Sequence, residues 1–384
     1  MTRYIDHYIR NEAERDRLDR VGVLTELFNK RAANYDREGS FPFENFEDLR
    51  EIGYLKWTVP QEYGGDEISL YEMVQVQERL AYGDGSTALA AGWHLGQILH
   101  LRISRKWPEK LFADLCHDIV QHGAMMNVFA SEAGTGSPSR GGRPETTAVR
   151  TEGGWLISGR KTFSTLAPIL DRFVVTAHVV EEDTVSEFLI QRSEQTTIDE
   201  TWNTLGMRGT GSHDVILNKA FAADHARITG KGNDDGGGWL LHIPACYMGI
   251  ALAARDYALN FAKTYKPGSI QGSIATLPTV QQSIGKMEAE LRTARSVLYE
   301  AAELWDQDPS SRQNMRAQLG LAKYVVTNNA ISIVDQAMRI VGAASLSKER
   351  PLERYYRDIR AGLHNPPMDN NVMNQLAAEA LGEE

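Results

Sequence analysis

Apolar residues recur at helical spacing through the first third of the chain. In the stretch FENFEDLREIGYL (Phe43–Leu55) they fall at every third position, which places them on one face of a helix. The stretch Leu70–Leu101 is also rich in apolar residues and helix formers and is interrupted by Gly83 and Gly85, so it predicts two helices with a break between them. We therefore expect residues from about 6 to 115 to be helical.

The pattern changes in the middle of the chain, where short runs of Val, Ile and Phe alternate with polar turns. Two such runs flank Gly153 and Gly154, which is typical of a β-hairpin. Three further runs predict strands, namely RFVVTAHVV (172–180), SEFLIQR (186–192) and HDVILNKAFA (213–222). The segment from Met125 to about Ala222 is accordingly predicted to be a small β-domain.

The last third is helical again and begins after GKGNDDGGG (Gly230–Gly238), which has the composition of a flexible linker. The predicted helices are 239–265, 277–305, 311–341, 352–363 and 370–381. Their lengths and short connections indicate a four-helix bundle. The resulting fold class is α+β, mainly α, with predicted domains at 1–122, 123–229 and 230–384.

Composition narrows the classes of partner. The chain of 384 residues has a net charge of −10, which argues against nucleic acid as its main partner. No run of about 18 apolar residues is long enough to cross a membrane, and no secretory signal is visible, so we expect a soluble, cytoplasmic protein. The two cysteines, Cys116 and Cys246, do not indicate a disulfide scaffold.

Standard catalytic and metal-binding motifs are missing from the sequence. Cys116, His117 and His122 lie close together, but their spacing matches no zinc pattern, and we expect no metal site. The chain has neither the G-x-S-x-G elbow of hydrolases nor a G-x-G-x-x-G turn between a strand and a helix.

Three segments of the predicted β-domain are candidates for ligand binding. The segment VFASEAGTGSPSRGG (Val128–Gly142) begins as a strand and continues as a loop of small and hydroxyl-bearing residues, which lets backbone N–H groups approach a ligand. In LISGRKTFSTLA, period-two alternation predicts that Lys161, Phe163 and Thr165 share one strand face, where an aromatic ring could stack on a flat ligand. The third segment, LGMRGTGSHDVIL (205–217), is a turn before a strand. From the residues alone, an ordinary loop after a strand and an outward-facing strand are the favoured explanations of the first two segments.

In their order, these segments resemble the acyl-CoA dehydrogenase superfamily. The family patterns T-E-x-x-x-G-S, G-x-K-x-W/F-I-T and G-M-R-G-S correspond to SEAGTGS, GRKTFST and GMRGTGS, and LREIGYLKWTVPQEYGG and RDIR resemble its early and late motifs. The resemblance implies an α-helical domain, a central β-barrel and a C-terminal four-helix domain. It also implies a flavin between the barrel and the last domain, usually in a homotetramer.

Carrying the family positions over gives a set of cofactor-binding residues. Phe163 and Thr165 would lie against the flavin ring, and the loop would contact flavin or substrate. The full set is Val128, Ala130, Ser131, Gly136, Ser137, Phe163 and Thr165.

Two departures concern the adenine half of the cofactor. Tyr265 stands where the family usually has an arginine, and VGAAS (Val341–Ser345) replaces its G-G-x-G loop. Both departures weaken the site for the adenine half. FAD is the commoner cofactor of the superfamily and stays our first expectation, and the departures make FMN the alternative.

A third departure concerns the catalytic base. The position of the family's glutamate falls on Pro366, and a second known position, near Gly238 and Trp239, has no carboxylate. Asp369 is the nearest acid, so a dehydrogenase would have to use it as the base.

A related branch, the two-component flavin monooxygenases of the dibenzothiophene type, needs no such base. LHNP (Leu363–Pro366) resembles its L-H-D-P, and GWHLG (Gly92–Gly96) resembles its G-Y-H-Y. In that branch His94, Thr165 and His364 would converge on one face of the flavin. The alternatives are that His94 is a core residue and that His364 interacts with a helix C-terminus.

We place α,β-dehydrogenation of an acyl-CoA thioester first and a monooxygenase that uses reduced flavin and O2 second. A flavin-fold binding protein without catalysis is the third hypothesis. The expected partners are a small-molecule substrate, first acyl-CoA, and either an electron-transfer flavoprotein or a flavin reductase.

Overall fold

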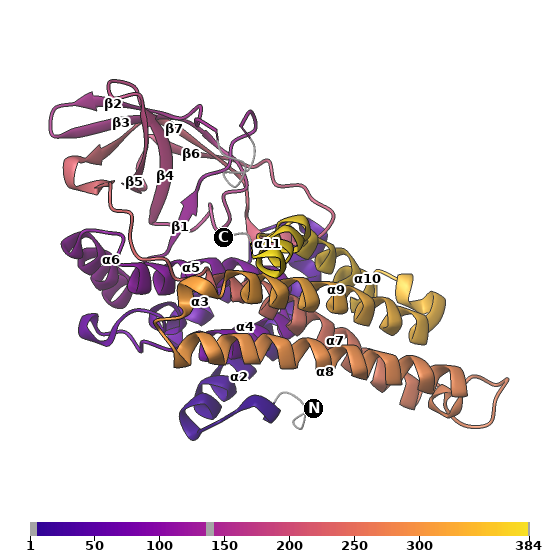
Figure 1. Cartoon of the computed structure of the whole chain (residues 1–384). Helices are drawn as coiled ribbons and strands as arrows, with labels where there is room; N and C mark the ends of the chain where they lie inside the picture. The colour runs from indigo at the N-terminus through magenta and orange to yellow at the C-terminus, as the bar shows by residue number, and fades with distance from the viewer. Residues whose placement is uncertain (1–5, 136–141, 383–384) are drawn as a thin grey trace.

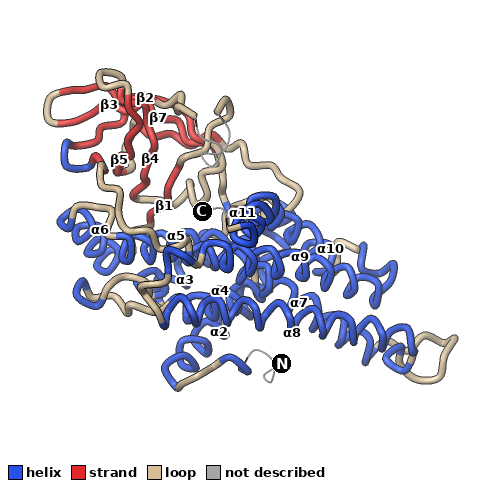
Figure 2. The backbone as a smooth tube through the Cα atoms, viewed as in Figure 1, coloured by secondary structure: helices blue, strands red, loops and turns tan. Residues whose placement is uncertain are grey.

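The computed structural model describes residues 6–135 and 142–382. A β-domain formed by the middle of the chain lies against a larger body of helices contributed by both ends of the chain (Figure 1). Strands and helices occupy separate parts of the molecule, as Figure 2 shows, and separate parts of the sequence, which confirms the predicted α+β class.

The N-terminal helices follow the apolar pattern. Ser69 begins α4 with a capping box to Glu72, and Asp84 both ends α4 and caps α5 through the Thr87 N–H. The predicted break between two helices is therefore confirmed at Asp84. The helices are α2 (Glu12–Glu38), α3 (Phe43–Glu51), α4 (Leu70–Gly83), α5 (Gly85–Ser104) and α6 (Glu109–His122), with the 3-10 turn η2 (Tyr54–Lys56).

The C-terminal helices agree with the predicted ones to within a few residues. They are α7 (His242–Thr264), α8 (Pro278–Gln307), α9 (Arg316–Val341), α10 (Pro351–Ile359) and α11 (Asp369–Leu381). The 3-10 turn η7 (Gly238–Leu241) leads into α7, η10 (Gly342–Leu346) lies between α9 and α10, and η11 (Arg360–Leu363) lies between α10 and α11. The helices α7, α8 and α9 pack on one another, and α10 lies against α7 and α9.

The two helical ends of the chain share one core. Helix α4 packs against α7 so closely that a Cβ on Gly249 would lie 2.3 Å from the Glu78 carbonyl oxygen. Beside this crossing, Arg295 on α8 donates to Glu78 at 2.7 Å, and both side chains are buried. The first and last predicted domains are thus in direct contact through α4, α7 and α8.

The β-domain is one mixed sheet that curls until β5 and β7 come into contact. Its strands pair in the order β6-β7-β3-β2-β4-β5-β8, and β1 pairs with β4 in parallel. The predicted hairpin is confirmed as β2 and β3, and β4, β5 and β7 match the other predicted strands. The strands are β1 (Met126–Phe129), β2 (Thr147–Thr151), β3 (Gly154–Lys161), β4 (Arg172–Val179), β5 (Thr184–Gln191), β6 (Thr196–Asp199), β7 (Asp214–Ala223) and β8 (Arg227–Ile228), with the turn η5 (Arg208–Thr210) before β7.

The prediction of a flexible linker at 230–238 is wrong for its second half, because residues 235–238 are packed, whereas residues 230–234 are exposed. Asp235 is buried and its carboxylate lies 2.7 Å from Nδ1 of His100 on α5. Its carbonyl oxygen accepts a hydrogen bond from Nε1 of Trp305 on α8 at 2.8 Å. The glycines that suggested flexibility instead give positive φ angles at Gly236 and Gly237, which let the chain turn into η7.

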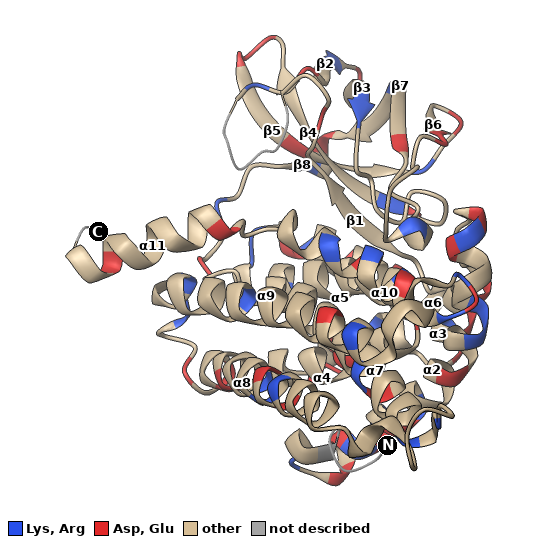
Figure 3. Cartoon of the chain, turned by 90° about the vertical axis from the view of Figure 1, so that its right-hand side faces the viewer, with Lys and Arg blue, Asp and Glu red and all other residues tan. Residues whose placement is uncertain are grey.

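Charges of both signs are scattered over the helices visible in Figure 3. Within the described ranges, no helix is long and apolar enough to cross a membrane. Nor do three metal-ligating side chains lie together anywhere in residues 6–135 and 142–382.

Candidate active site

The three candidate segments of the β-domain lie side by side. The Thr162 N–H donates to the Ser131 carbonyl oxygen at 2.9 Å, which joins the loop after β1 to the segment after β3. The Asn127 amide donates to the Thr165 carbonyl oxygen at 3.0 Å. The Thr165 hydroxyl lies 2.8 Å from the Ser212 hydroxyl, in the turn before β7. Segments that are far apart in the sequence therefore form one continuous surface.

The donor and the acceptor can be assigned in each hydrogen bond between the hydroxyl groups of this surface. The Thr210 hydroxyl donates to the Met207 carbonyl oxygen at 3.0 Å, so it must accept from the Ser212 hydroxyl, 2.8 Å away. Ser212 then has no proton left for Thr165, and the Thr165 hydroxyl donates to it. The Thr165 oxygen consequently has a lone pair, rather than a proton, for a ligand.

Lys161 and Phe163 do not share a face, so that prediction is wrong. Lys161 is fully buried, whereas Phe163 is 69% exposed. Strand β3 ends at Lys161, and Phe163 has a φ of 53°, so the alternation of an extended strand stops between them.

The Phe163 ring forms an exposed aromatic platform. It packs edge-on against Trp202, with ring centroids 5.7 Å apart. The Ser164 hydroxyl beside it is buried and has no hydrogen-bond partner among the described residues. A large exposed ring held in a left-handed conformation, beside an unpartnered hydroxyl, is a candidate surface for a ligand. A flat, polar-edged ring such as a flavin fits this arrangement.

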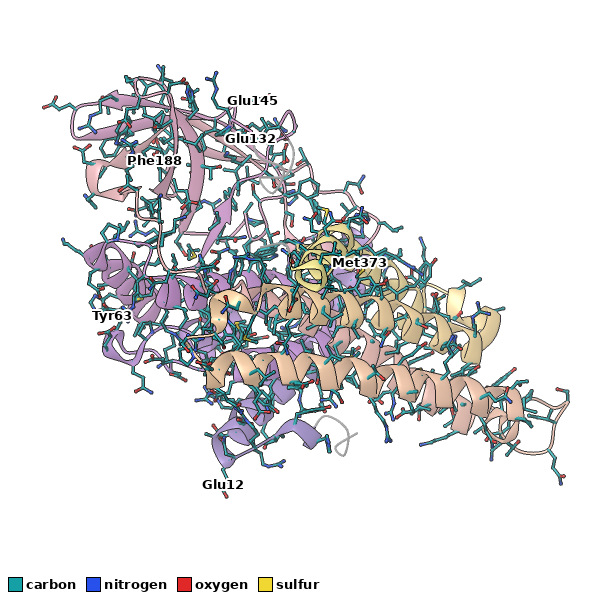
Figure 4. All side chains as sticks on the ribbon, in the orientation of Figure 1. Glu12, Tyr63, Glu132, Glu145, Phe188 and Met373 are labelled. Atoms are coloured by element: carbon teal, nitrogen blue, oxygen red, sulfur yellow. The ribbon has the colours of Figure 1, made fainter. Side chains whose placement is uncertain are left out.

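A buried ion pair that the sequence analysis did not assign holds the loop and the strand together. Lys161 Nζ lies 2.6 Å from Glu132 Oε1, and the two side chains are 0% and 1% exposed. Glu132 also accepts from the Thr146 N–H and hydroxyl and from the Glu145 N–H; Glu132 and Glu145 are labelled near each other in Figure 4. Burial raises the pKa of Glu132, but these bonds outweigh it and the net pKa is lowered. Glu132 belongs to the SEAGTGS motif and Lys161 to the GRKTFST motif, so the sequence does contain both partners within recognised motifs.

A second unassigned residue joins the β-domain to the helices. Asp358 on α10 is buried and accepts the Met207 N–H at 2.6 Å. It thereby fixes the turn that carries Ser212.

Of the three predicted catalytic residues, His94 is engaged on both sides of its ring. Its Nε2 lies 3.0 Å from the Leu55 carbonyl oxygen, and its Nδ1 accepts the Met126 N–H at 3.1 Å. Burial lowers the pKa of His94 to about 4, so the ring is neutral. This geometry gives His94 the core role that the sequence left open, in which it positions β1.

The other two lie at the break between α10 and α11. His364 is exposed at the end of η11. Asp369, at the start of α11, lies 3.2 Å from Nζ of the buried Lys323 and accepts from the Asn328 amide at 3.1 Å. The Tyr247 hydroxyl donates to the Asn365 side-chain oxygen. No hydrogen bond, ion pair or ring contact among the described residues brings His94, Thr165 and His364 together.

The remaining predicted cofactor-binding residues lie in β1 and in the loop that follows it. Val128 is in β1, and Ala130 and Ser131 follow it, all three partly exposed. Gly136 and Ser137 lie outside the described residues.

Comparison with known proteins identifies the three parts of the chain. Residues 18–105, 127–220 and 241–363 match the acyl-CoA dehydrogenase N-terminal, middle and C-terminal domains. "Putative acyl-CoA dehydrogenase YdbM" of Bacillus subtilis (strain 168) is 48% identical over 97% of this chain and 99% of its own length. The amino sugar nitrososynthase RubN8 of Streptomyces rubradiris is 31% identical, with coverages of 92% and 86%.

The similar proteins also include a named monooxygenase and a solved structure with bound FMN. The dibenzothiophene monooxygenase of Rhodococcus erythropolis is 26% identical over 93% of this chain and 91% of its own length. The X-ray structure of a KijD3 in complex with FMN and an amino-keto sugar nucleotide superimposes with a TM-score of 0.86 at 27% identity, covering 98% of this chain and 95% of that one.

Proposed function

We propose that this chain, which belongs to the acyl-CoA dehydrogenase family and is a flavin-dependent oxidoreductase, is a monooxygenase that uses reduced flavin and O2. One oxygen atom would go to the substrate, the other would leave as water, and the bound reduced flavin would supply the two electrons. The reduced flavin would come from a separate reductase. The relatives named as monooxygenase and nitrososynthase support this branch.

The observation that carries the proposal is that no unengaged carboxylate lies between Arg360 and Asp369. Pro366 occupies the position of the dehydrogenase glutamate and has no group that accepts a proton. Asp369, the predicted substitute, is held by Lys323 and Asn328. To act on a substrate, this carboxylate would have to leave both of these partners, one of which is a buried ammonium. An oxygenation needs no such proton transfer.

The hydroxyl chain agrees with a reduced cofactor. Thr165 offers a lone pair to the ligand, and the reduced flavin ring carries an N–H that the oxidised ring lacks. Phe163 would cover the ring face, and the loop around Ser131 would contact its polar edge.

Acyl-CoA dehydrogenation remains the second candidate, since the 48% identical relative carries that name. One experiment separates the two functions. The flavin-loaded protein is mixed with a panel of acyl-CoA thioesters without oxygen, and the flavin absorbance is followed. In parallel, reduced FMN and labelled O2 are supplied with candidate substrates, and the label in the products is measured by mass spectrometry.

We expect no loss of flavin absorbance with any acyl-CoA and one labelled oxygen atom in the product of an accepted substrate. Asp369→Asn should retain oxygenation. Rapid bleaching by an acyl-CoA that is abolished by Asp369→Asn would refute the proposal and establish Asp369 as the base.

The cofactor is FAD or FMN, and we expect the chain to bind both with similar affinity. Tyr265 ends α7 and is 48% exposed, stacked on Phe261 with ring centroids 4.9 Å apart, where the family usually has an arginine. Without that charge the adenine half would add little affinity. A hundredfold preference for FAD, about 2.7 kcal/mol, would contradict this expectation.

Phe163→Ala should weaken flavin binding by about 1–3 kcal/mol, or about fivefold to 150-fold, because it removes a stacking surface. Titration of FMN and FAD, followed by quenching of flavin fluorescence, measures this change. Phe221→Ala is the matched control, because Phe221 is 51% exposed on β7. Equal affinities of wild type and Phe163→Ala would exclude Phe163 from the flavin site.

The predicted homotetramer and the reductase partner also stay proposals. A native mass measurement of the flavin-loaded protein tests the first, and stimulation of oxygenation by an added flavin reductase tests the second.

A further inference from the structure

Three aromatic side chains cluster where α5 meets the start of α7. The His242 ring lies 4.9 Å from the Trp93 ring and 6.1 Å from the Trp239 ring, centroid to centroid. Trp93 and Trp239 pack edge-on, with centroids 5.9 Å apart. His242 is fully buried, whereas both tryptophans are partly exposed. The tryptophan side of the cluster therefore reaches the surface.

The tautomer of His242 follows from its single hydrogen bond. Nδ1 lies 2.8 Å from the Trp239 carbonyl oxygen, which only accepts, so Nδ1 carries the proton. Nε2 then carries the lone pair. That atom is buried and has no hydrogen-bond partner among the described residues. Burial lowers the pKa of His242 to about 4, which keeps the ring neutral and Nε2 an acceptor.

The helix opposite leaves room for this ring and for Gln77 on α4. A Cβ on Gly92 would lie 2.0 Å from Nε2 of Gln77 and 2.7 Å from Cδ2 of His242, and a Cβ on Gly96 would lie 3.0 Å from Nδ1 of His242. A buried acceptor without a donor is destabilising. The unpaired Nε2 therefore indicates a role beyond packing, because an apolar residue at position 242 would avoid this cost.

The cluster is connected to the proposed flavin surface through α5. This helix packs against β1 and η5, which lead to the Ser131 loop and to Ser212, and against η7, which carries Trp239. The unpaired acceptor and the proposed cofactor segments are therefore held by one rigid element.

We propose that this cluster binds a flat aromatic ring bearing an N–H or O–H group, with that group donating to Nε2 of His242 and the ring packing against Trp93 and Trp239. The ligand class is thus that of indoles, phenols and anilines. This inference rests on the proposed function in one respect, namely that the ring bound here is the substrate that the enzyme oxidises.

Two ligands of nearly equal shape test the hydrogen bond. Indole carries an N–H donor, and benzofuran has an oxygen in its place. Binding of each to the full chain, with and without FMN, is measured by equilibrium dialysis. Wild type is expected to bind indole about tenfold more tightly than benzofuran, the ratio that one ordinary hydrogen bond gives.

Two variants test whether the preference for indole over benzofuran depends on the imidazole of His242. His242→Phe keeps a ring but removes the acceptor, and the ratio should fall to about one. His225→Phe is the matched control, because His225 is exposed on the β-domain, and it should keep the tenfold ratio.

Equal binding of the two ligands by wild type, no binding of either at millimolar concentration, or a ratio that survives His242→Phe would each overturn the proposal. If His242→Phe does not fold, the wild-type ratio still decides. Because dialysis needs neither oxygen nor turnover, failure of the oxygenation assay and failure of this binding are separate results.

Discussion

Replacing Lys161 by methionine is expected to lower the free energy of unfolding by about 3–5 kcal/mol, because it leaves the Glu132 carboxylate buried without its ion-pair partner. Glu132 is 1% exposed, so water cannot replace the ammonium. Urea unfolding measures the loss. The same variant should bind flavin weakly, since the pair fixes the loop that Ser131 belongs to.

The chain contains a matched control for this prediction. Lys106 and Glu187 lie at the same distance, 2.6 Å, but both side chains are 26% exposed. Lys106→Met should cost less than about 1 kcal/mol, because solvent screens that pair. The double variant Lys161→Met/Glu132→Gln should be more stable than Lys161→Met alone. Equal losses at the two lysines would show that burial does not decide the strength of these pairs.

Asp358→Asn is expected to gain stability relative to wild type as the pH rises. Burial, partly offset by the Met207 N–H and Arg354, raises the pKa of Asp358 from 3.8 to about 7 in the folded protein. The folded state therefore binds this proton more tightly than the unfolded state does. Its contribution to stability is complete below pH 4 and is lost as the pH rises through about 7.

A pKa difference of this size corresponds to about 3–5 kcal/mol. Unfolding free energies of wild type and Asp358→Asn, measured at pH 4.5 and pH 8, should therefore differ in the variant's favour by several kcal/mol more at the higher pH. Glu152→Gln, in the exposed turn between β2 and β3, is the control. A difference that stays constant over this pH range would mean that Asp358 is already ionised in the folded protein at the lower pH.

The helices were predictable because their signals are local. The three-residue spacing from Phe43, the break at Asp84 and the glycine-rich stretch before α7 all lie within one or two turns of the structure they specify. The strands β6 and β8 were missed because four and two residues, respectively, are too short for an alternation to be recognised.

The surface around Phe163 shows where periodicity stops being informative. Period-two alternation predicts one common face for Lys161, Phe163 and Thr165. The backbone leaves the extended region after Lys161, and with the positive φ of Phe163 its side chain does not point to the same side as Lys161. The Glu132–Lys161 pair joins two of the recognised motifs, 29 residues apart, but the motifs alone do not show that the two side chains meet. The Met207–Asp358 bond joins positions 151 residues apart, and no local pattern connects them. His242 was missed for the same reason, since only the fold shows that its Nε2 has no partner.

The close crossing of α4 and α7 has a consequence for synthesis on the ribosome. Because Gly249 and the backbone of Glu78 are in van der Waals contact, the apolar face of α4 has its proper partner only after about 160 more residues, from Gly83 to His242, have been made. At about 5–20 residues per second, the emerging N-terminal helices remain without that partner for roughly 10–30 s. The β-domain, whose strands all lie within one continuous segment, can fold during this interval. The newly made helices would therefore be the part of the chain that holdase chaperones bind, and a ribosome-bound fragment ending before α7 should be more sensitive to protease in its helices than in its sheet.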